Sequence, residues 1–184
     1  MDELLDVLDT DGTPTGETKL KSEVHRLGLF HHTVHIWCYT LDGHVLLQQR
    51  GKDKNTFPLL WDVSVAGHIG AGETVIDGAM REMEEEIGLT AEAEQFEKIF
   101  TFKSLKKPTK GLIDNELHHV FLFPLEVALS QLKKQENEVA ALRFLPVQHF
   151  KREILENNNG YTYVPHSDAY YATVLSAMRQ RIPL

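Results

Sequence analysis

Short runs of largely apolar, β-branched and aromatic residues recur along the chain between turn signals, which predicts β-strands. Strands of this kind are expected at residues 4–9, 33–40, 44–50, 61–65, 95–102, 116–123 and 139–145. Asp42-Gly43 separates the second strand from the third, so these two are predicted to form a hairpin. A glycine-rich loop is expected at 67–72, directly after the strand at 61–65.

From Thr74 to Ile87 the apolar residues recur with a period close to 3.6 residues, which predicts a helix. Its apolar positions fall mostly on one face: Val75, Ile76, Ala79, Met80, Met83 and Ile87. Thr74 and Asp77 are spaced as in a capping box, and Gly88 stands where the helix should end. Further helices are expected at 146–156 and 168–181, separated by the helix-breaking segment 157–160.

Several strands, few helices and no regular alternation of strand and helix favour an α+β fold, in which helices cover a sheet. A chain of 184 residues has the size of one domain, and no repeat or low-complexity linker divides it. We therefore expect a single domain over residues 1–184. Strands within residues 1–30 and helices within residues 146–184 would be extensions of this domain.

Composition excludes several classes of protein. The chain has 42% hydrophobic and 25% charged residues, as soluble globular proteins do, and no apolar run approaches the roughly 20 residues of a membrane-spanning helix. The acidic first residues do not resemble a secretory signal, and the single Cys38 cannot form an internal disulfide, so a cytoplasmic protein is expected. A net charge of −8 argues against a nucleic-acid duplex as partner.

Basic residues gather in two places along this acidic chain. The first group is Arg50, Lys52 and Lys54, and the second is Lys103, Lys106, Lys107 and Lys110. The second group is expected to lie in a solvated loop between two strands, because runs of like charge are usually exposed. Arg50 and Lys54, together with His68 of the glycine-rich loop, are candidates for binding an anionic substrate.

The helix at 74–87 carries an unusual cluster of carboxylates. Glu82, Glu84, Glu85 and Glu86 share only Arg81 as a counter-charge, and they lie near the helix end where the dipole disfavours anions. Glu82 and Glu86 are four residues apart and therefore share a face with Glu85 beside them, whereas Glu84 is expected to face solvent. A bound cation would relieve the repulsion, and oxygen ligands favour Mg²⁺ or Mn²⁺.

Gly67, Glu73 and the run from Arg81 to Leu89 match the Nudix box at every fixed position. The chain therefore resembles the Nudix hydrolases. This resemblance implies an α/β/α sandwich with a mixed sheet and a cofactor of Mg²⁺ or Mn²⁺. The implied reaction is attack of water on a small-molecule diphosphate, in which the diphosphate is joined to another chemical group.

The same resemblance implies roles for the residues of the box. Glu82 and Glu86 would be the principal metal ligands, Glu85 would assist them directly or through water, and the carbonyl of Gly67 or Ala66 would complete the metal shell. The expected metal site is therefore Glu82, Glu85, Glu86 and Gly67, with Ala66 as the alternative to Gly67.

The remaining roles concern orientation and proton transfer. Arg81 would orient the glutamates, acting through Glu73. The general base stays open between Glu82 or Glu85 of the box and Glu116 outside it, because family members differ in this residue. Glu116 could equally be an ordinary glutamate beside a strand.

Outside the box the chain is similar to the type I isopentenyl diphosphate isomerases, which are related to the Nudix hydrolases. The similar pieces are His31-His32, residues 46–50, residues 56–58, Trp61, Gly67-His68 and residues 114–116. In those enzymes histidines and acids bind a metal. A corresponding second site here would use His25, His31 or His32, His68, Asp114 and Glu116, although each histidine alone could be an ordinary hydrogen-bonded one.

One position separates the two enzyme classes. Ala66 stands where the isomerases carry a catalytic cysteine, and a methyl group cannot transfer a proton. We therefore expect a hydrolase that cleaves a nucleoside diphosphate or another organic diphosphate. The alternatives are an isomerase-like enzyme and a non-catalytic nucleotide-sensing domain. A homodimer is compatible with the sequence but does not follow from it.

Overall fold

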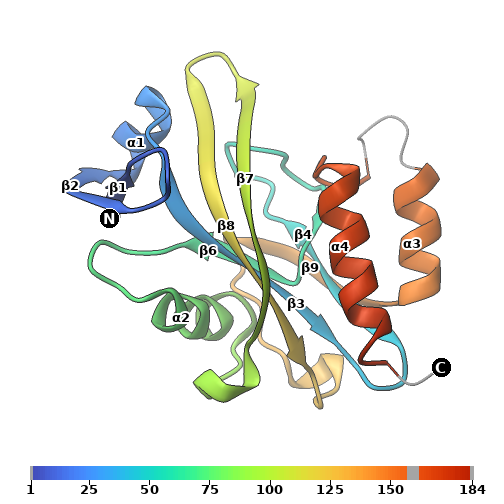
Figure 1. The fold of residues 1–184 in the computed structure, drawn as a ribbon. Coiled ribbons are helices and arrows are strands. Elements are labelled where there is room, and N and C mark those ends of the chain that lie inside the picture. Colours follow the sequence, from blue (N-terminus) through green and yellow to red (C-terminus); the bar gives the residue numbers. More distant parts are fainter. Residues whose placement is uncertain (1, 157–161, 183–184) are drawn as a thin grey trace.

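The computed structural model describes residues 2–156 and 162–182 and shows a mixed sheet between helices (Figure 1). The sheet consists of β3 (His31–Tyr39), β4 (His44–Arg50), β5 (Trp61–Asp62), β6 (Val65–His68), β7 (Glu97–Thr109), β8 (Leu112–Pro124) and β9 (Val139–Pro146). Strand β3 runs parallel to β8 and antiparallel to β6. The other pairs in the sheet, including β7 with β8, are antiparallel.

The hairpin of β3 and β4 forms only at its turn. Tyr39 pairs with Val45, and beyond this pair the two strands separate. Strand β3 then continues beside β6 and β8, while β4 continues beside β5 and β9. The sheet is thereby divided into two halves that are joined at one end and open at the other.

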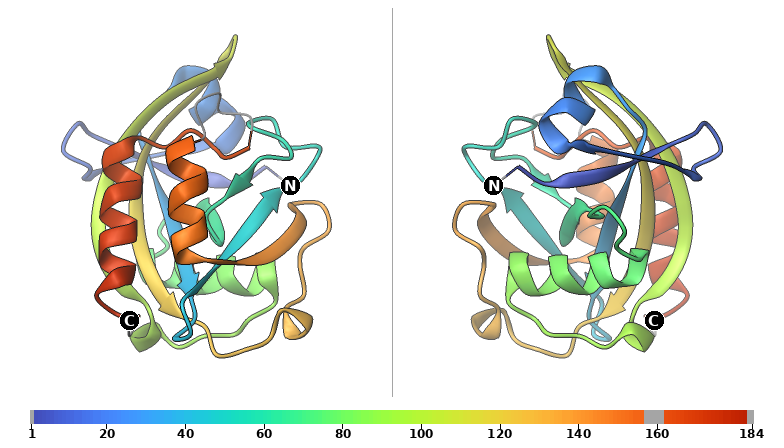
Figure 2. Two further views of the ribbon diagram at one scale, coloured as in Figure 1. Left: turned by 90° about the vertical axis from the view of Figure 1, so that its right-hand side faces the viewer. Right: turned by 90° about the vertical axis from the view of Figure 1, so that its left-hand side faces the viewer.

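Helices cover both faces of this sheet, as Figures 1 and 2 show. Helix α2 (Val75–Ile87) lies on one face, and α3 (Val147–Glu156) and α4 (Asp168–Arg179) lie on the other. Each face has its own apolar core, in which Met83 of α2 and Phe150 of α3 are fully buried. Burying such a side chain contributes about 1.5–3 kcal/mol. The α/β/α sandwich with a mixed sheet is confirmed.

Helix α2 begins and ends where the sequence predicts. The Thr74 hydroxyl accepts a hydrogen bond from the Asp77 backbone N–H at 3.2 Å. Gly88 adopts φ 68°, the left-handed conformation that glycine tolerates best, and its N–H donates to the Glu84 carbonyl at 2.9 Å. These caps fix the length of α2 and therefore the places of its glutamates.

The N-terminal segment contains a helix that the sequence analysis missed. Residues 1–30 were expected to contribute strands, and β1 (Leu4–Leu8) and β2 (Pro14–Leu20) form a separate two-stranded sheet. They are followed by helix α1 (Lys21–Leu27), of which only Val24 is buried. A helix of two turns with one buried residue gives almost no periodic signal.

The strand expected at 61–65 is interrupted in the structure. Side chains in the middle of this segment bond to main-chain groups: Asp62 accepts from the Val63 N–H at 2.9 Å, and Ser64 accepts from the Cys38 N–H at 2.8 Å. The chain therefore passes from β5 to β6, which belong to different halves of the sheet. Gly67 and His68, expected in a loop, are the last residues of β6.

The expected lysine-rich loop is also wrong. Strands β7 and β8 are 13 residues each and pair as far as Thr109 and Leu112. Lys103, Lys106 and Lys107 therefore lie within β7, in a hairpin that projects beyond the rest of the sheet in Figure 1. The cross-strand hydrogen bonds of the hairpin outweigh the low strand propensity of lysine.

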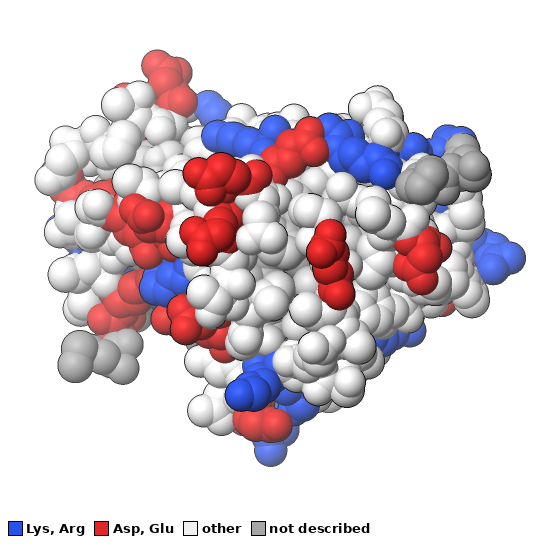
Figure 3. Space-filling view, turned by 90° about the horizontal axis from the view of Figure 1, so that it is seen from below, with Lys and Arg blue, Asp and Glu red and all other residues white. Residues whose placement is uncertain are grey.

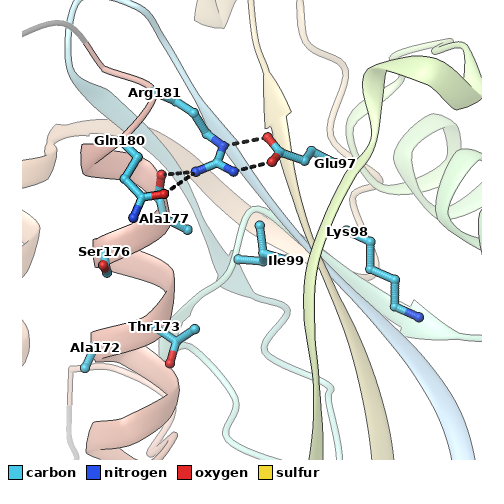
Figure 4. A pocket seen from close by; sticks show the side chains of 9 residues that line it. All are labelled: Glu97, Lys98, Ile99, Ala172, Thr173, Ser176, Ala177, Gln180 and Arg181. Atoms are coloured by element: carbon cyan, nitrogen blue, oxygen red, sulfur yellow. Dashed lines mark hydrogen bonds and ion pairs between the residues drawn. The ribbon is translucent and has the colours of Figure 1, made fainter.

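The two C-terminal helices are confirmed at Val147–Glu156 and Asp168–Arg179, and the expected breaker at 157–160 lies outside the described residues. Helix α4 runs along β7, with a groove of about 480 Å³ between them. Figure 4 shows Arg181, just after α4, paired with Glu97 at the start of β7. This ion pair ties the end of α4 to the edge of the sheet.

The surface is mixed in charge on the face seen in Figure 3, where acidic and basic side chains lie among neutral ones. Within residues 2–156 and 162–182, no helix is long and apolar enough to cross a bilayer.

Candidate active site

A cleft of about 840 Å³ lies between the two halves of the sheet, a volume typical of small-molecule sites. Charged and polar side chains from α1, β3, α2 and β8 line it, together with residues of the loops after β4 and before α4. The sequence-predicted candidates that lie in its wall are Arg50, Lys54, Gly67, His68, Arg81, Glu82, Glu85, Glu86 and Glu116.

Two of the α2 glutamates are buried. The exposed fraction is 8% for Glu82 and 3% for Glu86, whereas Glu84 and Glu85 are exposed, as expected for Glu84. Burial, together with the charge of Glu82, raises the pKa of Glu86 to about 8. Burial also raises the pKa of Glu82. Two buried carboxyl groups side by side suit a divalent cation, which would favour their ionised forms.

Arg81 holds this group of acids together. Its Nε and Nη2 atoms each donate to Glu73 at 2.9 Å, so this contact is bidentate. Its Nη1 atom donates to Glu82 at 2.8 Å and to Glu85 at 3.2 Å. Its Nη2 atom also donates to the His68 carbonyl at 2.8 Å. Arg81 therefore fixes α2 to the end of β6, with Glu73 as its anchor.

Strands β6 and β4 hold the same glutamates from the other side. The Glu86 carboxyl accepts from the Ala66 N–H at 3.0 Å and from the Gln48 side-chain amide at 2.9 Å. A Cβ atom at Gly67 would lie 1.9 Å from the carboxyl carbon of Glu82. Glu82 can occupy its position only because residue 67 has no side chain.

Residues 29–165 match the model of the NUDIX domain, and this segment includes the cleft-lining part of α2 together with Gly67 and Glu73. The chain belongs to the NUDIX family. Relatives of this chain bear the name Nudix hydrolase. The resemblance of the chain to the Nudix hydrolases is confirmed, and α2, which carries the glutamates of the box, is called the Nudix helix below.

The similar proteins include Nudix hydrolases and isopentenyl-diphosphate isomerases, the two enzyme classes that the sequence suggested. Nudix hydrolase 3 of Arabidopsis thaliana is 36% identical over 98% of this chain, but the chain spans only 24% of the length of that protein. An isopentenyl-diphosphate Δ-isomerase of Serratia proteamaculans is 34% identical over 66% of each chain. The crystal structure of DR0079 from Deinococcus radiodurans, at 19% identity, covers 94% of this chain and 98% of its own with a TM-score of 0.69. This likeness shows the fold.

A cluster of histidines faces the Nudix helix across the cleft. His25 of α1, His31 of β3 and His68 of β6 offer ring nitrogens that lie within 4.8 Å of one another. The Nδ1 atom of His31 donates to the Leu29 carbonyl at 2.9 Å, which leaves its Nε2 atom facing the cluster. This Nε2 atom is buried and has no hydrogen-bond partner among the described residues. An orphaned ring nitrogen beside two others fits a metal site.

Glu116 belongs to the same cluster. Its Oε1 atom lies 3.7 Å from His31 Nε2 and 3.9 Å from His68 Nε2. Burial alone would raise its pKa, but the imidazoles of His31, His118 and His68 around it hold the pKa of Glu116 well below its usual range. Glu116 is therefore an ionised carboxylate at neutral pH, and it lies in the wall of the cleft.

Asp114 and His32 were also expected in the cluster, and the structure places only Asp114 beside it. Asp114 Oδ1 lies 3.0 Å from His25 Nδ1 and so orients the ring of His25 from behind. His32 points to the opposite face of the sheet, because neighbouring residues of a strand alternate in direction. Its Nδ1 atom lies 2.9 Å from His119 Nε2, and His32 is therefore not part of the cluster.

The two basic candidates line the cleft but are engaged with protein groups. Arg50 contacts Asp62 at 3.3 Å and donates to the Thr56 carbonyl at 3.0 Å. Lys54 forms an ion pair with Glu138. Both side chains thus anchor the loop after β4 at the edge of the cleft, and a phosphate group would have to share them with these partners.

Several cleft residues were missed by the sequence analysis: Lys21, His35, Asp62, Lys106, His118 and His166. A period of two along His31, Thr33 and His35 could have shown that β3 carries a polar face. Glu116 and His118 repeat this pattern on β8, to which β3 is paired. His166 lies in the loop before α4 and has no comparable signal.

Proposed function

We propose that this protein is a Mg²⁺- or Mn²⁺-dependent hydrolase that cleaves an organic diphosphate, in which a diphosphate is joined to a non-phosphate group. The observation that carries the proposal is the arrangement of Arg81, Glu82 and Glu86. Two buried carboxyl groups are held against the glycine at position 67 by an arginine that is itself anchored. Repelling charges are retained in this way where a cation is to be bound.

The divalent cation would neutralise the diphosphate and activate the attacking water. In this assignment Glu82 and Glu86 hold the cation, with help from Glu85 and the Gly67 carbonyl. Arg81 keeps Glu82 and Glu85 turned toward the cleft. Glu82, Glu85 and Glu116 are the candidates for accepting the proton of water, and Glu116 is favoured by its ionised state and its three facing imidazoles.

We further propose that His25, His31, His68 and Glu116 bind a second cation in the same cleft. The support is the set of three converging ring nitrogens with the carboxylate 3.7–3.9 Å from two of them. Imidazole ligands favour Mn²⁺, Zn²⁺ or Fe²⁺ over Mg²⁺. The sequence likeness to isomerases applies to this site, but Ala66 faces the cleft where a proton donor would be required.

The test is a panel of organic diphosphates incubated with the protein and Mg²⁺ or Mn²⁺, with the products separated and identified. A diphosphate cleaved to a monophosphate product, in a reaction abolished by EDTA, is the expected result. Isopentenyl diphosphate should give no dimethylallyl diphosphate. Isomerisation by the unmodified protein, or turnover of the panel in metal-free buffer, would overturn the proposal.

A further inference from the structure

The inner end of the cleft lies beyond the histidine cluster and is unusually polar for a buried place. His35 of β3 and His118 of β8 stack with ring centroids 4.0 Å apart, and His166 lies 5.3 Å from His35. Lys106 of β7 reaches the same place, with its Nζ atom 3.5 Å from His166 Nδ1. Neither the box nor the proposed second cation site uses these four residues.

The hydrogen-bonding role of His35 follows from its partners. Trp37 Nε1 can only donate, and it donates to the Tyr170 hydroxyl at 3.0 Å. The Tyr170 hydroxyl proton then points to His35 Nδ1, which lies 2.7 Å away. Burial and the neighbouring histidines hold the pKa of His35 well below its usual range, so the ring is neutral. Its single proton is therefore on Nε2, which is left as a donor.

His166 is fixed in the same manner. Asp62 is an acceptor, so His166 Nε2–H donates to it at 2.9 Å, and the opposite ring nitrogen accepts from Lys106. Asp62 also accepts from the Val63 N–H and from Arg50, so its oxygens are already occupied. The carboxylate and His166 are thus satisfied by protein groups, whereas Lys106 retains further N–H donors.

His118 adds a third donor. Thr33 Oγ1 lies 2.7 Å from its Nδ1 atom, and its Nε2 atom faces the carboxylate of Glu116 at 3.8 Å. The Thr33 hydroxyl has no other hydrogen-bond partner within the described residues, so it donates to Nδ1 and leaves the ring proton on Nε2. The side chain is 1% exposed, and Nε2 has no hydrogen-bond partner among the described residues. An unpartnered buried donor in a cleft wall is costly unless a ligand satisfies it.

The free polar groups at this end are therefore donors: His35 Nε2–H, His118 Nε2–H and the ammonium of Lys106. Lys106 forms no ion pair within the described residues, and its Nζ atom lies 5.5 Å from the ring centroid of Phe57. A hydrocarbon chain placed here would leave all three donors without acceptors. An oxygen atom with lone pairs would satisfy them.

We propose that the inner end of the cleft recognises an acceptor oxygen, carbonyl or carboxylate, on the organic group of the substrate, and that Lys106 is the residue that selects it. This inference rests on the proposed function, because the diphosphate end is taken to lie at the Nudix helix. It makes the substrate an oxygenated organic diphosphate and excludes a plain prenyl diphosphate.

The test measures binding, so that it does not depend on turnover. Non-hydrolysable methylene-bridged analogues of alkyl diphosphates are prepared in graded chain lengths, ending in an isopropyl group, a methyl ketone or a carboxylate. Their affinities for the protein with Mg²⁺ are measured by calorimetry and expressed relative to the methyl analogue, which carries neither a chain nor a terminal group. Comparison of the ketone series with the carboxylate series shows which of the two kinds of acceptor oxygen is recognised.

At the best chain length, an oxygen-terminated analogue should bind about 10–100-fold more tightly than its isopropyl counterpart, as expected for a hydrogen bond to a charged group. Lys106→Met should remove this preference. Lys107→Met is the matched control, because Lys107 is exposed on the same strand, and it should keep the preference. Thermal melting checks that both variants fold.

Two results would overturn the inference: equal or better binding of the isopropyl series, or an oxygen preference that survives in Lys106→Met. Turnover of the hydrolysable diphosphates is assayed separately. If no diphosphate is cleaved while the oxygen preference is present, the hydrolase assignment fails and the recognition site stands. If cleavage occurs without any preference, only the recognition site fails.

Discussion

The cleft has two walls that are built in opposite ways: the carboxylates of the Nudix helix form one, and the histidine cluster with Glu116 forms the other. The carboxylates of the Nudix helix come from one run of sequence and are held by Arg81, which lies in that same run. The histidine cluster is assembled from α1, β3, β6 and β8, and no two of its three histidines are neighbours in the sequence. The first wall is therefore set by local structure, and the second exists only when the sheet is complete.

The two walls also shift the pKa of a buried carboxyl group in opposite directions. Glu86 and Glu116 are both buried carboxyl groups in this cleft. The pKa of Glu86 is raised to about 8 by burial and by its acidic neighbour, while the imidazoles around Glu116 hold its pKa well below its usual range. Without a cation, the Nudix helix holds a proton and the histidine cluster holds a charge. The first wall thus depends more on a metal than the second does.

Glu86→Gln should have the largest effect on activity. The amide keeps the size of the side chain and can still accept from the Ala66 N–H, but it is a poor metal ligand. The loss of a metal contact that stabilises transition-state charge amounts to several kcal/mol, so kcat should fall on the order of 10³-fold or more. Steady-state kinetics with saturating Mg²⁺ measures this change.

Glu84→Gln is the control, because Glu84 is exposed on the other side of the same helix. Its kcat should stay close to that of the parent. If Glu86→Gln retained activity within tenfold of the parent, the cation would have to be held elsewhere, and the histidine wall would become the catalytic one.

Gly67→Ala should have the next largest effect. The added methyl would meet the end of the Glu82 side chain, which can turn away, so the fold should persist while Glu82 leaves its place. We expect kcat to fall about 100-fold, as for the misplacement of a catalytic group, with little change in the melting temperature. Gly70→Ala is the control, since its new Cβ would lie 3.4 Å from the nearest atom, of Glu73. Equal activity of the two variants would contradict the close packing of Glu82 on residue 67.

The sequence predicted the local wall almost completely and the assembled wall only in part. The caps of α2 and the exposure of Glu84 follow from spacing within one helix, and the resemblance to the family implied the contact of Arg81 with Glu73. His118 and Lys106 acquire their positions from the pairing of β3 with β8 and of β8 with β7, which a single sequence does not specify. The lysine-rich segment was misjudged for this reason: strand pairing turned Lys106 into the cleft and left Lys107 outside.

His31→Asn should separate the two walls by metal content. Asparagine can still donate to the Leu29 carbonyl but cannot present a ring nitrogen to the cluster. The affinity for a second, Mn²⁺- or Zn²⁺-type ion should fall about 10–100-fold, measured by calorimetry, while hydrolysis with Mg²⁺ falls about tenfold or less. His44→Asn, in which the histidine stands at the far end of β4, is the control. A loss of hydrolysis as large as that of Glu86→Gln would mean that both walls serve one metal centre.

The last comparison of the two walls concerns the pH dependence of stability without metal. The pKa of Glu86 is about 8 in the folded protein and 4.5 when unperturbed, so between these values the folded protein binds a proton that the unfolded chain releases. The stabilising contribution of this proton is complete below pH 4.5 and is lost as the pH rises through 8. In EDTA, the free energy of unfolding of the parent should therefore fall relative to Glu86→Gln, by up to about 1.4 kcal/mol per pH unit.

Urea denaturation of both proteins from pH 5 to pH 9 measures the difference, and the two curves should run parallel above pH 8. Saturating Mg²⁺ should abolish the fall in the parent, because the cation favours the ionised carboxylate. Parallel curves over the whole range in EDTA would show that Glu86 is ionised without a cation, and the contrast between the two walls of the cleft would then be lost.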